Sequence, residues 1–153
     1  MASVLALILA LATGTAAPMP SPQALRTIVV AAPRATLTLQ VADTEQERET
    51  GLMSVTHLRP HTGMLFVFRY DAPVQFWMKD TLVPLDMVFL SSNGTVRSIA
   101  SNVRAVAPNT PDAAIPRRNG TAKYVIELPA GEAERDAIIP GVHLPVQSQA
   151  SLQ

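Results

Sequence analysis

The 153 residues are enough for one domain with a single hydrophobic core, but not for two. Lysine plus arginine and aspartate plus glutamate number 12 each, so the formal net charge is zero and we expect no nucleic-acid partner. Because cysteine is absent, disulfides, thiolate metal ligands, a cysteine nucleophile and a lipid anchor on cysteine are excluded.

The N-terminal segment has the features of a secretory signal peptide. The first 25 residues contain no charged side chain, and the apolar run at residues 4–12 is followed by small residues up to Ala17. This pattern predicts a signal peptide over residues 1–17 and a periplasmic or secreted protein. The run is shorter than the roughly 20 apolar residues that span a bilayer, so we expect no stable membrane insertion after the leader is removed.

Residues 18–34 are predicted to form a proline-rich lead-in that ends in a short strand at residues 27–31. The main β domain is expected over residues 35–147, with a frayed tail at residues 148–153. Its first strand, residues 35–42, alternates between apolar and polar side chains, as a half-buried strand does.

Two short helices are expected in this domain. Thr44 and Glu47 have the spacing of a capping box, which predicts a helix that ends near Gly51. The second helix should begin after Pro129 and end near Ala137.

Most of the remaining chain is predicted to be strand. Residues 102–120 are rich in proline and arginine and predict a long loop. Asn93 and Gly94 predict a hairpin with a type I′ turn. Further strands are predicted at residues 63–68, 74–79, 86–90, 95–100, 124–128 and 141–146.

This succession of elements predicts the fold class. Seven or so short strands and two short helices, without alternating βαβ units, favour a mainly β fold. We expect a compact antiparallel β-sandwich or a partly closed barrel.

Several motifs also occur in a recognisable order. They are VADT at residues 41–44, GLM at 51–53, GMLFVF at 63–68, FWMKDT at 76–81, PLDM at 84–87 and ELPAG at 127–131. Together they closely resemble the DUF192 family, also called UPF0127, over residues 37–146. The resemblance implies a small, mostly β domain that is often exported and whose function is not established.

The chain departs from the family pattern at three places. Asp80 stands where the family usually has asparagine, and Ser54 begins a segment in which an arginine is common. His143 stands where an aspartate is usual. Asp80 adds a carboxylate to the polar residues near Trp77. The missing arginine removes a potential partner for a carboxylate.

Polar side chains gather around the only tryptophan. Trp77 shares a predicted strand face with Lys79, and Asp86 begins the next strand. We predict a non-catalytic binding or accessory module that holds a small polar ligand or a loop of a protein partner, without a cofactor. The predicted ligand-binding residues are Trp77, Lys79, Asp80, Thr81, Asp86 and Glu127.

Two alternatives remain open for these residues. Asp86 and Glu127 could be the carboxylate pair of a hydrolase or lyase, if the strands bring them together. In a purely structural module, Asp86 would instead accept backbone NH groups across residues 80–85 and pair with Lys79. Glu127 would then end its strand by binding loop NH groups.

No metal site is predicted. His57 and His61 are four residues apart, but Pro60 lies between them and prevents the helix that would align them. Methionine thioethers suit Cu(I), yet the four candidates occupy apolar runs typical of a core. These candidates are Met53, Met64, Met78 and Met87.

Overall fold

The computed structural model describes residues 24–147. The predicted signal peptide, most of the lead-in and the predicted tail lie outside the described residues. The strands are β1 (Thr27–Ala31), β2 (Thr36–Ala42), β3 (Thr62–Trp77), β4 (Leu85–Leu90), β5 (Val96–Val103) and β6 (Arg117–Pro129). The helices are α1 (Glu45–Thr50), the 3-10 helix η1 (Asp112–Ala114) and α2 (Glu132–Arg135).

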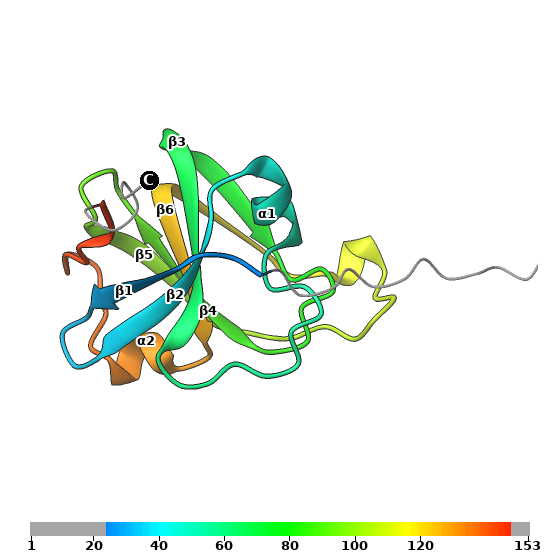
Figure 1. Ribbon diagram of the computed structural model, residues 1–153. Coiled ribbons are helices and arrows are strands. Elements are labelled where there is room, and N and C mark those ends of the chain that lie inside the picture. Colours follow the sequence, from blue (N-terminus) through cyan, green and yellow to red (C-terminus); the bar gives the residue numbers. More distant parts are fainter. Residues whose placement is uncertain (1–23, 148–153) are drawn as a thin grey trace, which may run out of the picture.

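All six strands belong to one sheet with the order β1-β2-β3-β6-β4-β5 (Figure 1). Neighbouring strands are antiparallel except β2 and β3, which run parallel. Within the described residues the edge strands β1 and β5 do not pair, so the sheet is not closed into a barrel. The prediction of a compact, mainly β fold with two short helices is confirmed, and the sheet is mixed.

Strand β3 folds back over the sheet. Phe66 and Phe76 are ten residues apart, which in a straight strand would separate them by about 33 Å. Their ring centroids are only 4.9 Å apart. The bend coincides with the shift in the β3–β6 register between Val67 and Ala72. The distal halves of β3 and β6 therefore form a ribbon that covers one face of the sheet, as the bent green strand of Figure 1 shows.

The sheet separates two apolar clusters. All six residues of β4 are buried, because this strand has a core on each side. Met87 and Phe89 face the cluster beneath the folded-back ribbon, which also contains Phe66 and Phe76. The other cluster takes side chains from β1, β2 and β5, and α2 contributes Ala133 to it.

The capping box predicted for α1 is confirmed. Thr44 Oγ1 accepts a hydrogen bond from the backbone NH of Glu47, and Glu47 Oε2 accepts one from the backbone NH of Thr44. The backbone hydrogen bond from Thr44 is the main reason why the pKa of Glu47 is lowered. Leu52 follows the helix and is buried in the core. No helix within residues 24–147 is long and apolar enough to cross a bilayer.

The hairpin at Asn93 is confirmed, but the turn prediction is wrong. Only Gly94 has a positive φ, of 80°, whereas a type I′ turn requires positive φ at both central residues. The loop spans residues 92–94, and Gly94 donates to the carbonyl oxygen of Ser91 at 2.9 Å. Asn93 instead uses its side-chain oxygen to accept a hydrogen bond from the backbone NH of Thr95.

A loop prediction and a strand prediction in the second half of the chain also need correction. Strand β6 begins at Arg117, so the predicted loop at residues 102–120 is shorter than expected. Among residues 24–147, the predicted strand at residues 141–146 forms only one bridge, between Thr95 and His143. Pro140 and Pro145 have no backbone NH, which limits pairing in this segment.

Candidate functional site

Trp77 lies at the end of β3, where the ribbon ends. It pairs across the strands with Arg117, and 38% of its surface is exposed. Lys79 Nζ lies 5.0 Å and Arg117 Cζ 5.8 Å from the ring centroid. These distances fit cation–π contacts. Trp77 is therefore surrounded by positive charge, and Lys79 pairs with this ring instead of with Asp86.

The turn after Trp77 fixes the two residues that follow Lys79. Asp80 has a φ of 49°, in the left-handed region, and its carbonyl oxygen accepts a hydrogen bond from the backbone NH of Ser54. Thr81 is buried and donates its hydroxyl proton to the carbonyl oxygen of Lys79 at 3.1 Å. The backbone of Asp80 thus connects this turn to the segment after α1.

Glu127 is a buried carboxyl group in the middle of the sheet. It lies on β6 between Met64 of β3 and Met87 of β4, and only 4% of its surface is exposed. Its side chain makes no hydrogen bond or ion pair with any residue in the range 24–147. Burial raises the pKa of Glu127 to about 8, so most of the molecules carry a neutral carboxyl group at pH 7.

Glu127 opens into a narrow cleft, which we call the Glu127 slot. Trp77, Lys79 and Thr81 line it on the strand side, and α1 and the following turn provide the opposite wall. The slot has a volume of about 30 Å³, which admits a group the size of one or two water molecules. A shallower groove of about 530 Å³ adjoins it along Trp77. Four residues line both spaces: Arg48, Glu49, Phe76 and Trp77.

Asp86 lies on the opposite face of the sheet. It pairs with Leu128, whereas its neighbour Met87 pairs with Glu127, and successive residues of a strand point to opposite faces. Asp86 accepts hydrogen bonds from the backbone NH groups of Asn102, at 2.7 Å, and Ala133, at 3.0 Å. Asp86 and Glu127 therefore do not form the carboxylate pair that a hydrolase or lyase would need. The structural alternative predicted that Asp86 accepts backbone NH groups from residues 80–85. The NH donors are those of Asn102 and Ala133 instead.

The slot therefore brings together Trp77, Lys79, Thr81 and Glu127, with Asp80 in the adjoining turn. Whether these residues bind a ligand stays a prediction.

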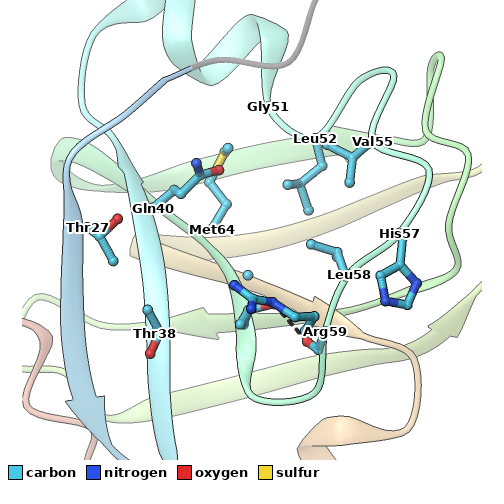
Figure 2. Close-up of a pocket in the computed structure, with 12 residues that line it drawn as sticks. Thr27, Thr38, Gln40, Gly51, Leu52, Val55, His57, Leu58, Arg59 and Met64 are labelled. Atoms are coloured by element: carbon cyan, nitrogen blue, oxygen red, sulfur yellow. Dashed lines mark hydrogen bonds between the residues drawn. The ribbon is translucent and has the colours of Figure 1, made fainter.

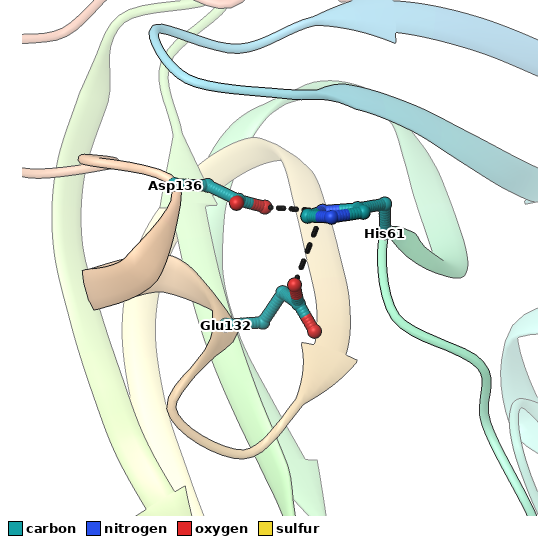
Figure 3. Close-up of side chains that lie close together, drawn as sticks. All are labelled: His61, Glu132 and Asp136. Carbon is teal, nitrogen blue, oxygen red and sulfur yellow. Dashed lines mark hydrogen bonds and ion pairs between the residues drawn. The ribbon is translucent and has the colours of Figure 1, made fainter.

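The two histidines occupy different surroundings. His57 lines a groove of about 430 Å³ between β2 and the loop after α1. Figure 2 shows Thr27 and Thr38 on the strand side of this groove and Leu52 on the loop side. His61 instead points toward Glu132 and Asp136 beside α2 (Figure 3). Sequence reasoning missed this cluster, because no local pattern connects His61 with residues more than 70 positions away.

Comparisons with known proteins agree with the motifs. The family model DUF192, described as uncharacterized ACR, matches residues 27–146. A search of curated proteins finds no significant match. A crystal structure of a Sinorhizobium meliloti protein, provisionally named a transcription regulator, is 36% identical with a TM-score of 0.69, and the match covers 81% of this chain and 96% of that one.

A second crystal structure is of a Novosphingobium aromaticivorans protein of unknown function. It is 27% identical with a TM-score of 0.67, and the match covers 84% of this chain and 93% of that one. Motifs, family model and fold agree, and the chain belongs to the DUF192 family.

Proposed function

We propose that this protein is a non-catalytic binding module that holds a small polar ligand in the Glu127 slot. The observation that carries the proposal is the neutral, buried Glu127 carboxyl group, which has no partner among the described residues and faces a cleft. No residue in the range 24–147 satisfies this carboxyl group, which is reached from the slot. A ligand group that enters the slot would supply its hydrogen bonds.

The chemistry of the slot favours a hydroxyl or amide group. A protonated carboxyl group can donate one hydrogen bond and accept others, so it matches groups that also do both. The slot admits one such group, while the rest of the ligand would lie in the adjoining groove along Trp77. A sugar has both a hydroxyl to insert and an apolar ring face to place against an aromatic side chain.

We further propose that the protein works in the periplasm or is secreted. The support is the uncharged, apolar segment at residues 1–17, with its small residues before Pro18. Mass spectrometry of the protein from fractionated bacteria should find a new N-terminus near Pro18 in the periplasm or medium. A full-length chain confined to the cytosol would contradict this proposal.

A thermal-shift screen tests ligand binding. The protein without residues 1–17 is mixed with monosaccharides, disaccharides, amino sugars and amino acids near pH 7. A ligand at about a hundred times its dissociation constant adds roughly 2.7 kcal/mol, which raises the melting temperature by several degrees. The wild type should show such a rise with at least one member of the panel.

Variants then assign the site. Trp77→Ala and Glu127→Leu should abolish the shift, whereas Glu127→Gln should keep it because an amide still donates and accepts hydrogen bonds. The control is Tyr70→Ala, which removes another exposed aromatic side chain that does not line the slot. A shift that persists in Glu127→Leu would overturn the proposal. A panel without any shift would favour a loop of a protein partner as the occupant.

A further inference from the structure

His61, Glu132 and Asp136 form a compact cluster on the α2 side of the sheet (Figure 3). His61 Nδ1 lies 3.1 Å from Glu132 Oε1 and 3.1 Å from Asp136 Oδ2. The side chain of Glu132 is 1% exposed and that of Asp136 is 3% exposed, whereas the imidazole is 47% exposed. Two carboxylates are thus buried beneath a half-exposed ring.

The spacing of these atoms suits metal coordination. Ligands at bonds of about 2.0–2.2 Å from an ion, with angles between about 90° and 109°, are roughly 3.0–3.5 Å apart. The two nitrogen–oxygen distances fall in this range, and the ligand atoms all lie within 4.8 Å of one another. The three side chains are therefore close enough together to hold one metal ion.

The charges in the cluster leave room for a cation. Arg135 Nη2 lies 3.2 Å from Glu132 Oε2 and compensates one carboxylate, so one negative charge remains when the imidazole is neutral. Nδ1 faces two carboxylate oxygens but can carry only one proton, which points in one direction. Asp136 Oδ1 makes no hydrogen bond with any other residue of the described range. A metal ion would bind both carboxylates and the imidazole at once.

We propose that His61, Glu132 and Asp136 bind a divalent first-row transition metal ion, with Zn²⁺ as the reference case. One imidazole and two carboxylates are ligands that Zn²⁺, Mn²⁺ and Co²⁺ accept. Three protein ligands leave a coordination position for water, and the half-exposed imidazole shows that solvent reaches the cluster. Arg135 holds the second oxygen of Glu132 and so orients this ligand.

This site is independent of the Glu127 slot. None of its three residues lines the slot, and α2 packs on the opposite face of the sheet. Bound metal would connect α2 to the start of β3, two segments that are far apart in the sequence. The two proposals can therefore fail separately.

Isothermal titration of the untagged, chelator-treated protein with ZnCl₂ tests the site. At about pH 7.5 we expect one ion per chain. His61→Ala should weaken binding about tenfold or more, because it removes the only nitrogen ligand. His57→Ala is the matched control, since this exposed histidine lies outside the cluster, and it should bind Zn²⁺ as the wild type does.

Glu132→Gln and Asp136→Asn test the carboxylates, after circular dichroism has shown that each variant is folded. Both should weaken Zn²⁺ binding, whereas Glu134→Gln, at an exposed position of the same helix, should not. Because His61 is half exposed, its variant decides the outcome even if the buried variants do not fold. Equal affinity in His61→Ala and wild type, or no binding of Zn²⁺, Mn²⁺ or Co²⁺ at about 1 mM, would overturn the proposal.

Discussion

Two buried carboxyl groups on neighbouring strands differ in their hydrogen bonding. Asp86 accepts two backbone NH groups, while Glu127 has no partner within the described part of the chain. In the sequence both are acidic residues beside apolar ones, and alternation alone does not show which donors will reach them. The pairing of β4 with β6 determines the difference, because it directs the two side chains to opposite faces.

The pKa of Glu127 makes stability depend on pH. The folded-state pKa of Glu127 is about 8, above the ordinary value of 4.5, so the folded state holds the proton more tightly. The stability that this gives is complete below about pH 4.5 and is lost as the pH rises through 8. The wild type should lose roughly 5 kcal/mol of its free energy of unfolding over this pH range. Glu127→Gln cannot ionise, so it should not show this loss.

Urea unfolding of both proteins at several pH values between about 5 and 8.5 measures this effect. The variant should be the more stable protein at the alkaline end. Glu134→Gln is the control, because it removes an exposed carboxylate on α2, and it should follow the wild type. Parallel pH profiles for wild type and Glu127→Gln would contradict the raised pKa.

Asp86→Ala should destabilise the protein without affecting the slot. The substitution leaves the NH groups of Asn102 and Ala133 without their acceptor, at a cost of about 2–5 kcal/mol. Urea unfolding at pH 7 measures the loss, and Asp112→Ala, on the exposed helix η1, is the control. A loss below about 0.5 kcal/mol would show that Asp86 does not hold α2 and β5 in place.

At the scale of elements, local patterns predicted local structure well. The alternation over residues 74–79 placed Phe76 and Met78 inside and Trp77 outside, and the α1 capping box was visible in two residues. The first part of β6 was missed because residues 117–121 are polar and form a strand only through pairing with the ribbon half of β3. Such pairing depends on a partner strand far away in the sequence, so no local sequence pattern predicts it.

The part of the candidate site that is local in sequence was predictable, and the part that depends on strand pairing was not. Trp77, Lys79 and Thr81 lie close together in sequence, and their meeting in the slot follows from one strand end and one turn. Glu127 joins them only because β6 lies beside β3, and Asp86 is directed away for the same reason. Contacts between side chains on different strands could be predicted only once the strand pairing was known.

The bend of the ribbon depends on a small residue in β6. A Cβ atom at Gly120 would lie 2.4 Å from Cδ1 of the Phe89 ring, so any side chain would push the ribbon off the sheet. Gly120→Ala should lower the free energy of unfolding by about 1–3 kcal/mol, as overpacking does. Thermal and urea unfolding measure this loss, and Thr121→Ala, at the exposed neighbour, should stay within about 0.5 kcal/mol of wild type. Equal stability of both variants would contradict close packing of the ribbon.

At the scale of the whole molecule, stability should be highest at the centre of the sheet. Strands β3, β6 and β4 each have a neighbour on both sides, while β1 and β5 each have only one among the strands of residues 24–147. Local opening is cheapest where few contacts are lost. Hydrogen exchange followed by mass spectrometry should therefore find the slowest amides in β6 and β4 and faster exchange in β1. Faster exchange in β6 than in β1 would contradict this order.

The position of β6 also has a consequence for how the chain is made. It joins β3 to β4, and without it the sheet would consist of two separate parts, β1-β2-β3 and β4-β5. Residues 117–129 follow all five other strands in the chain, so neither part can dock on the other until β6 has also been synthesised. A nascent chain that lacks β6 is therefore expected to stay incompletely folded, whatever the stability of the strands already made.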